Sequence, residues 1–154
     1  MGIKSFQGAR GPAKKEYDAP ILVADHMTKK LITFHPDQSI LEVMELFAKH
    51  SISGGPVLDD NGFLVGIISE GDCMKQIAES RYFNMPIVDK SVSKYMTPNV
   101  ETISHDTSIF DAAGIFHKNN RRRLPVLRDG ILVGQISRKD VVIAALKLSA
   151  QNYK

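Results

Sequence analysis

The chain has 154 residues, of which 43% are hydrophobic and 24% are charged. This composition is typical of a globular protein and excludes a fully disordered chain, and the length fits one domain or two very small ones. The formal net charge of +3 is as compatible with small anionic ligands as with nucleic acid.

Cysteine and histidine usage argues against metal and disulfide chemistry. Cys73 is the only cysteine, so no disulfide can form within the chain, and no Cys/His cluster predicts a zinc site. The five histidines are scattered, and we expect no metal.

No apolar run approaches the roughly 18 residues of a membrane span, and the N-terminus lacks the apolar core of a signal peptide. The sequence therefore predicts a cytoplasmic protein.

Beyond its first residues the chain repeats itself. Residues 1–19 are rich in Gly, Pro and Lys, which predicts a flexible basic arm. Met27-Thr28 then recurs as Met96-Thr97, a shift of 96 − 27 = 69 residues, and the shift falls to 68 after a turn. We expect a first repeat at residues 20–78, a linker at 79–91, a second repeat at 92–148 and a tail at 149–154.

Each repeat begins with a short β-rich run, at residues 31–34 and 100–103, followed by a capped helix. Ser39 and Ser108 stand at the predicted N-caps, each with an acidic residue three positions later. The apolar positions of both helices have helical spacing: Ile40, Val43, Met44, Phe47 and Ala48 in the first repeat, and Ile109, Ala112, Ala113 and Phe116 in the second.

Two strands and a second helix complete each repeat. The strands are predicted at 56–58 and 63–69, and at 124–127 and 131–137. Asn61-Gly62 and Asp129-Gly130 join them, and both residue pairs favour positive φ. The closing helices are predicted at about 71–78 and 138–148. The order β-α-β-β-α, found twice, predicts an α+β fold whose repeats pack with pseudo-twofold symmetry, because one repeat has too little core to fold alone.

The polar residues that both repeats share lie where the last strand meets the last helix. Gly66-Ile67-Ile68-Ser69 leads to Asp72, and Gly134-Gln135-Ile136-Ser137 leads to Asp140. A helix N-terminus attracts anions, and a carboxylate can accept hydrogen bonds from the two vicinal hydroxyls of a ribose. Helix capping is the better explanation of a single Ser-x-x-Asp motif, but the repetition favours a ligand site.

With these motifs the chain resembles a pair of CBS domains, the cystathionine-β-synthase type repeat, over residues 20–146. The matching features are the Met-Thr openings, the two Pro-Val-Leu strands and both Gly-x-Ile-Ser-x-x-Asp stretches. The resemblance implies a regulatory module that binds an adenine nucleotide (AMP, ADP or ATP, or alternatively NAD or S-adenosylmethionine) in two clefts between the repeats.

The resemblance also assigns residues to each cleft. The aspartate would hold the ribose, the serine would lie near the ribose and phosphate, and the residue after the motif glycine would flank the base. One cleft would contain Asp140, Ser137 and Gln135, completed by Ala24, Lys29, Ile52 and Ser53. The other would contain Asp72, Ser69 and Ile67, completed by Ser93, Pro98, Arg121 and Arg122.

Arg121 and Arg122 would reach the nucleotide phosphates, for which a guanidinium is well suited. The first repeat has Ser53-Gly54-Gly55 at the positions equivalent to the arginine run, with no charge. This small, uncharged stretch could widen one cleft or leave it to a less charged ligand. The arginine run is also compatible with nucleic acid, although it has no interleaved aromatic residues.

No nucleophile–base pair or phosphate-binding lysine motif is present, so we predict no catalytic residue and no enzymatic activity. Cys73 corresponds to Val141 and is predicted to be a small buried hydrophobe.

The resemblance further implies a homodimer, held by exposed apolar residues of the amphipathic helices, that regulates a protein partner in trans. Two alternatives are a docking dimer with vestigial nucleotide sites and a nucleic-acid binder that uses Arg121–Arg123 and the basic arm.

Overall fold

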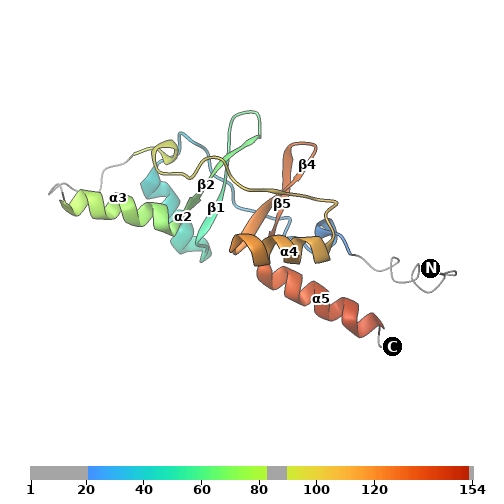
Figure 1. Ribbon diagram of the computed structural model, residues 1–154. Helices are drawn as coiled ribbons and strands as arrows, with labels where there is room; N and C mark the ends of the chain where they lie inside the picture. The colour runs from blue at the N-terminus through green and yellow to red at the C-terminus, as the bar shows by residue number, and fades with distance from the viewer. Residues whose placement is uncertain (1–20, 83–89, 153–154) are drawn as a thin grey trace. The chain divides into compact units, whose positions relative to one another are not determined.

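The computed structural model describes residues 21–82 and 90–152, and these form two compact units. The α2–α3 unit comprises described residues of the ranges 29–102 and 127–133, and the α4–α5 unit comprises those of 21–28, 103–126 and 134–152. The predicted arm at 1–19 lies outside the described residues, as do positions 83–89 of the predicted linker. Figure 1 shows the elements of both units.

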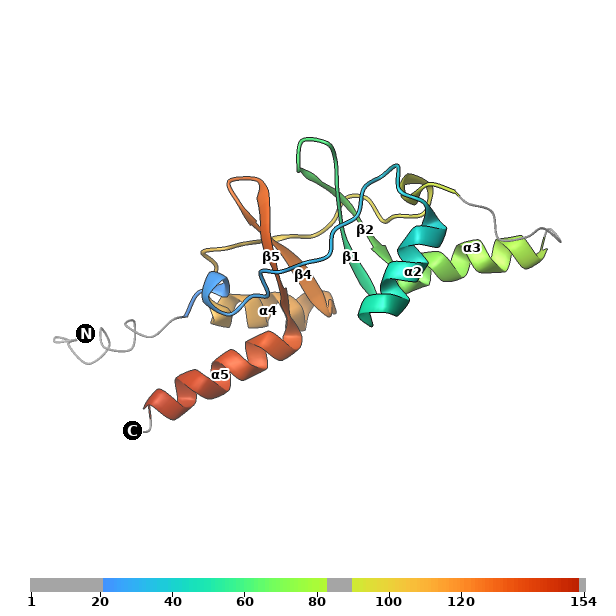
Figure 2. The same cartoon turned by 180° about the vertical axis from the view of Figure 1, so that it is seen from behind.

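The α2–α3 unit contains a two-stranded antiparallel sheet, two α-helices and a short 3-10 helix. Its elements are α2 (Ile40–His50), β1 (Gly54–Leu58), β2 (Leu64–Ser69), α3 (Glu70–Tyr82) and the 3-10 helix η2 (Val92–Lys94). Gly54 pairs with Ser69 and Val57 with Gly66, so the predicted hairpin is confirmed. α2 and α3 pack against each other, and the reverse view in Figure 2 shows α2 in front of α3.

The α4–α5 unit repeats this order with one more strand. Its elements are the 3-10 helix η1 (Val23–Asp25), β3 (Ile103–Ser104), α4 (Ile109–Asn119), β4 (Arg123–Arg128), β5 (Ile131–Ser137) and α5 (Arg138–Asn152), except that residues 127–133 at the β4–β5 turn group with the α2–α3 unit. The strands form a sheet of order β3-β4-β5. The helix and hairpin predictions are confirmed in both repeats, and α3 and α5 extend four residues beyond their predicted ends.

Serine caps fix where α2 and α4 begin. The Ser39 hydroxyl accepts a hydrogen bond from the backbone N–H of Glu42 at 3.2 Å, and Ser108 does the same for Asp111 at 3.0 Å. Both helices end in a left-handed residue, Ser51 in α2 and Asn120 in α4. The predicted caps are therefore confirmed, because the side-chain oxygen satisfies an N–H group that has no partner within the helix.

The two hairpin turns explain why the repeat shift falls by one residue. Asp129 and Gly130 both have positive φ, at 51° and 82°, as a two-residue turn requires. The first turn is longer, and only Gly62 has positive φ. There the Asp59 carboxylate accepts hydrogen bonds from the backbone N–H groups of Asn61 and Phe63, both at 2.9 Å. The expectation of positive φ was therefore wrong for Asn61.

The predicted strand at 31–34 is wrong, since it is reduced to one bridge between Phe34 and Val57. Phe34 donates to the carbonyl of Pro56 at 2.9 Å and accepts from the N–H of Leu58 at 2.8 Å. The next parallel bond toward the N-terminus would need an N–H at residue 56, and proline has none. Of the second predicted run, 100–103, only Ile103 lies in a strand.

Each unit has its own core. α2 buries Ile40, Val43 and Phe47 beneath the sheet, and the rings of Phe34 and Phe47 meet edge to face, with centroids 5.6 Å apart. α4 buries Ile109, Ala112 and Phe116 at the matching positions. Two helix positions expected in the core are exposed instead, Ala48 and Ala113, because each lies at the edge of its apolar stripe.

The two structural units and the two sequence repeats have different boundaries, because the first residues of each repeat belong to the other unit. The opening segment of the first repeat belongs to the α4–α5 unit, where Thr28 and Gln135 exchange two backbone hydrogen bonds of 2.9 Å. The opening segment of the second repeat belongs to the α2–α3 unit in the same way, and there Thr97 and Ile67 exchange bonds of 2.8 and 3.0 Å. Each unit is thus completed by the opening segment of the other repeat.

This close contact requires glycine at positions 66 and 134. A Cβ on Gly134 would lie 2.6 Å from Met27 Sδ and 2.8 Å from the backbone oxygen of Thr28, and a Cβ on Gly66 would meet Met96 and Thr97 in the same way. The repeated Met-Thr and Gly are therefore partners in one contact.

We predict that Gly134→Ala lowers the free energy of unfolding by about 1–3 kcal/mol, because overpacking against a backbone oxygen cannot be relieved by a side-chain rotation. Urea denaturation measures this change. Gly71→Ala is the control, since a Cβ there meets only Ser69 Oγ at an ordinary 3.6 Å. Equal stability of Gly134→Ala and the wild type would contradict the prediction.

Candidate functional site

The two Ser-x-x-Asp motifs form the same structure at the two strand–helix junctions. β2 ends at Ser69 and α3 begins at the next residue, and β5 ends at Ser137 immediately before α5. The backbone N–H of each serine donates to Oδ2 of the aspartate, at 2.8 Å for Asp72 and 2.9 Å for Asp140. Each aspartate N–H donates in return to the serine Oγ, at 3.4 and 3.1 Å.

These bonds make each motif a reciprocal helix cap, as the capping alternative predicted. They do not use the whole carboxylate, because within the described part of the chain no group donates to Oδ1 of Asp72 or Asp140. A carboxylate oxygen can accept two hydrogen bonds, and both aspartates are half-buried. The cap therefore orients the carboxylate and leaves one oxygen able to accept from a ligand hydroxyl.

The two serine hydroxyl groups differ in the hydrogen bonds that they donate. Ser69 Oγ donates to Asp72 Oδ2 at 3.0 Å. The equivalent bond is absent between Ser137 and Asp140 among the described residues, so the Ser137 hydroxyl accepts from Asp140 N–H and keeps its own proton for another acceptor. Ser137 is thus the better placed of the two to donate to an anionic oxygen.

The residues predicted to flank the base are fixed by the opening segments. Ile67 and Gln135 each pair through two backbone bonds with a threonine, Thr97 and Thr28 respectively. Both side chains are half-buried and lie on the strand that ends at the capping serine. The threonines were not among the predicted site residues, although the repeated Met-Thr was a signal that could have identified them.

Each unit brings together part of its predicted site. In the α2–α3 unit, Ile67, Ser69 and Asp72 occur with Ser93 and Pro98, and Ser93 is held by a 2.9 Å bond from its N–H to the carbonyl of Pro36.

In the α4–α5 unit, Gln135, Ser137 and Asp140 occur with Ala24, whose N–H donates to the carbonyl of His105 at 3.0 Å. The assignments that cross between units stay predictions: Lys29, Ile52 and Ser53 for the Asp140 cleft, and Arg121 and Arg122 for the Asp72 cleft.

The loop before β1 is hydrogen-bonded to the first residue of α3, and the loop before β4 is hydrogen-bonded to the first residue of α5. The N–H of Glu70 donates to the Ser53 carbonyl at 2.9 Å, and the N–H of Arg138 donates to the Arg122 carbonyl at 3.1 Å. Ser53 and Arg122 therefore occupy equivalent places next to a helix N-terminus. The side chains of Arg121, Arg122 and Arg123 are exposed, so this place is cationic in one unit and uncharged in the other.

The glycines of Ser53-Gly54-Gly55 do not widen a cleft at Gly55. A Cβ there would lie 2.6 Å from Cε2 of Phe34, so the aromatic ring already fills the space. The second repeat has the opposite arrangement, with buried Leu124 in place of Gly55 and Ile103 in place of Phe34. The glycine is thus a packing partner of a larger neighbour.

Cys73 is a core residue, 2% exposed, as the sequence predicted. Burial raises the pKa of its thiol above the ordinary value, and the negative charges of Asp72 and Glu70 raise this pKa further. The thiol is therefore protonated at neutral pH and is a poor nucleophile.

We predict that iodoacetamide alkylates native Cys73 at least tenfold more slowly than the urea-unfolded chain at neutral pH. Because the folded pKa is raised, the unfolded thiol ionises first, and the free energy of unfolding falls as the pH rises through the ordinary thiol range. Cys73→Val, which copies Val141, should remove this fall. Rapid labelling of the native protein would contradict the burial.

Two searches of the described residues were negative. They contain no group of three His, Cys, Asp or Glu side chains that could hold a metal ion. None of their helices combines the length and apolar character needed to cross a membrane.

The comparisons with known proteins decide the family. The sequence profile described as CBS domain matches residues 23–79 and 92–147. The chain belongs to the CBS domain family. The protein MJ1426 of Methanocaldococcus jannaschii is 32% identical, over 86% of this chain and 96% of its own length. Another relative from that organism, MJ1232, is 41% identical, but this chain spans only 38% of its length.

Two similar solved structures are complexes with adenosine-containing ligands. CBSX2, an Arabidopsis thaliana protein, in complex with AMP is 34% identical with a TM-score of 0.71, covering 84% of this chain and 98% of that one. The CBS domain pair of MJ0100, in complex with 5-methylthioadenosine and S-adenosylmethionine, is 32% identical with a TM-score of 0.68, covering 83% and 98%. The α+β fold with two CBS repeats is therefore confirmed.

Proposed function

We propose that this CBS pair is a regulatory module that binds an adenosine-containing ligand at the two Ser-x-x-Asp junctions. The observation that carries the proposal is the duplicated cap, which orients a half-buried carboxylate and leaves its Oδ1 able to accept from ribose hydroxyls. The adenosine ligands of the two solved relatives support the same ligand class. AMP, ADP and ATP are the first candidates, with NAD and S-adenosylmethionine next.

In this proposal the residues act as the family resemblance assigns them. Asp140 and Asp72 hold the ribose, and Ser137 and Ser69 contact the ribose and phosphate. Gln135 and Ile67 flank the base. Ala24, Lys29, Ile52 and Ser53 complete the Asp140 cleft, whereas Ser93, Pro98, Arg121 and Arg122 complete the Asp72 cleft.

The module has no catalytic residue in this proposal, so its output is a change of conformation that a partner protein detects. A ligand shifts such an equilibrium only by as much as its affinities for the two states differ. We further propose that the module acts in the cytoplasm as a homodimer. The partner is one whose activity follows the level of the adenosine ligand.

A docking dimer with vestigial sites is the second candidate function. The observation that favours it is the cap itself, because both aspartates already have a structural role without any ligand.

A thermal-unfolding titration with AMP, ADP, ATP, NAD and S-adenosylmethionine separates the two candidates. A ligand that binds only the folded state adds about 2.7 kcal/mol at a hundredfold excess over its Kd. We predict a saturable rise in Tm with at least one of the five. No rise with any of them at millimolar concentration would reject the nucleotide module and leave the docking dimer.

We also predict that Asp140→Ala weakens binding of that ligand at least tenfold in calorimetry, because the ribose hydroxyls lose their acceptor. The substitution also removes a helix-capping bond, which costs about 0.5–2 kcal/mol of stability. Ser108→Ala is the matched control, since it removes the cap of α4 (the Ser108–Asp111 bond) and leaves the proposed site intact. Equal affinity of Asp140→Ala and the wild type would remove Asp140 from the ribose role.

A further inference from the structure

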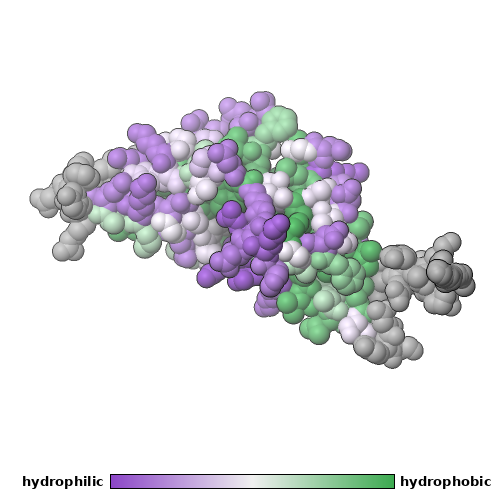
Figure 3. Space-filling model, in the orientation of Figure 1, coloured by the Kyte–Doolittle hydropathy of each residue, from purple (hydrophilic) through white to green (hydrophobic). Residues whose placement is uncertain are grey.

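The groove between α4 and α5 is lined by apolar side chains of both helices. Its volume is about 430 Å³, and small-molecule sites in proteins have volumes of about 300–1,000 Å³. Phe116 and Val141 are buried at its floor, and Ala113 and Val142 lie beside them. Figure 3 shows hydrophobic surface over the region of these two helices. The groove is therefore suited to an aliphatic group.

The polar lining residues gather where α4 ends and α5 begins. Asn120 is the C-cap of α4, and Arg138 is the first residue of α5. The N–H of Arg138 donates to the carbonyl of Arg122 at 3.1 Å, which holds the two helix ends together. His117 lies one turn before Asn120, and the three lining side chains are exposed. A guanidinium can donate to both oxygens of a carboxylate at once, and amide and imidazole N–H groups can donate to the same oxygens.

Apolar side chains continue away from this polar end along both helices. On α4, Phe110 precedes Ala113 by one turn and is 64% exposed. On α5, Val142 and Leu146 follow Arg138 at intervals of one turn, and they are 58% and 65% exposed. A ligand with an anionic head at Arg138 and an alkyl tail matches this order of side chains.

The first repeat provides an internal comparison for the groove. Met44 stands in place of Ala113, and it is half-buried against the core of its own unit. Glu70 stands in place of Arg138. The longer methionine side chain takes the space that alanine leaves open, and a carboxylate repels an anion. The small residue and the cation therefore occur together in the α4–α5 unit, and both are replaced in the α2–α3 unit.

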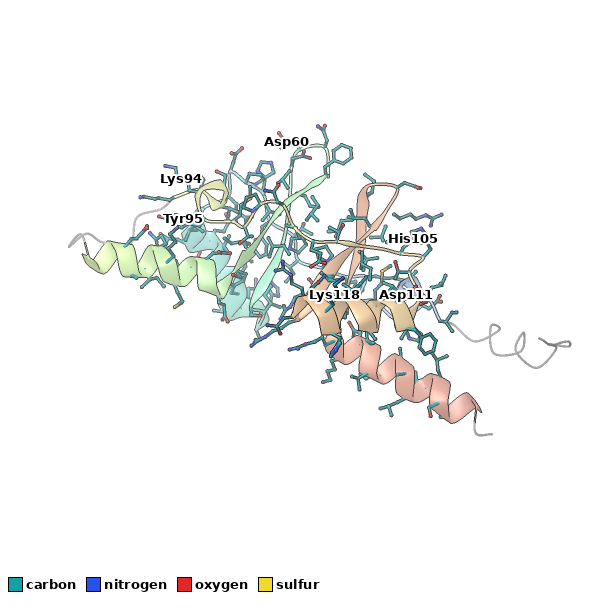
Figure 4. All side chains as sticks on the ribbon, in the orientation of Figure 1. Asp60, Lys94, Tyr95, His105, Asp111 and Lys118 are labelled. Carbon is teal, nitrogen blue, oxygen red and sulfur yellow. The ribbon has the colours of Figure 1, made fainter. Side chains whose placement is uncertain are left out.

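Two further exchanges between the repeats favour an anion at this groove. His117 stands in place of Ala48, and Gly114 stands in place of Glu45. Glycine is disfavoured inside a helix, and a Cβ on Gly114 would have no atom within 4 Å, so packing within the described chain does not require it. Lys118 is exposed near the end of α4 in Figure 4 and adds positive charge there. Compared with α2, α4 thus has one carboxylate fewer and one N–H donor more.

We propose that this groove binds a single-chain fatty acid, with its carboxylate at Arg138, Asn120 and His117 and its alkyl chain between α4 and α5. The ligand is not a peptide, because the backbone N–H and C=O groups along two helices are largely paired within them and leave a peptide main chain few partners. None of the lining residues is assigned to the nucleotide sites, so the fatty-acid site is a separate one.

Calorimetry with the full chain and decanoate, below the concentration at which decanoate forms micelles, tests the proposal. We expect saturable binding to the wild type. The affinity should rise by up to about fourfold for each methylene added between octanoate and dodecanoate, because each buried methylene contributes to transfer from water. Decanol has the same chain without the charge and should bind at least tenfold more weakly than decanoate.

Two substitutions introduce first-repeat residues into the groove. Ala113→Met fills the apolar part, and Arg138→Glu reverses the charge at the polar end. Each should raise the Kd of decanoate at least tenfold, and circular dichroism checks that each variant is folded. Lys139→Gly is the matched control. It copies Gly71 of the first repeat and removes a neighbouring cation that does not line the groove, so it should leave the Kd within threefold.

The absence of saturable binding, an affinity that does not depend on chain length, or an unchanged Kd in Ala113→Met overturns the proposal. Equal weakening by Lys139→Gly and Arg138→Glu also overturns it, since the attraction would then come from the basic surface and not from the groove. These measurements use no nucleotide, so their failure is distinguishable from failure of the proposed nucleotide sites.

Discussion

A two-bond backbone contact between a threonine and a strand organises each unit of this protein. Thr97 with Ile67, and Thr28 with Gln135, exchange hydrogen bonds of 2.8–3.0 Å beside a glycine that leaves room for a methionine. The contact joins an opening segment to the strand that ends at the capping serine. It therefore fixes the last strand, and with it the point at which the closing helix begins.

The functional geometry follows from where that strand ends. Because β2 and β5 lead directly into α3 and α5, a serine and an aspartate on the first turn can cap each other and still leave one carboxylate oxygen accessible. In the proposed function, helix capping and ligand binding use different oxygens of the same carboxylate. Both the capping and the ligand interpretations of the motif are thus compatible with one structure.

Duplication has kept the packing and allowed the surfaces to differ. In one unit the large ring of Phe34 packs beside Gly55. At the equivalent positions of the other unit, the smaller Ile103 is paired with the larger Leu124. Outside the core, Ser53 and Glu45 in one unit correspond to Arg122 and Gly114 in the other. These exchanges change charge and exposure without changing the fold, and they separate the possible roles of the two halves.

The sequence by itself determined the repeat, the element order and the caps, because each depends on local spacing and on residues such as Ser39 and Gly130 with strong conformational preferences. It also identified both Ser-x-x-Asp junctions, since their members are three residues apart. Only the tertiary structure decided that each opening segment completes the unit of the other repeat, that Phe34 fills the space beside Gly55, and that Gly114 has open space around it. These are contacts between residues distant in the chain, and no local pattern encodes which surfaces meet.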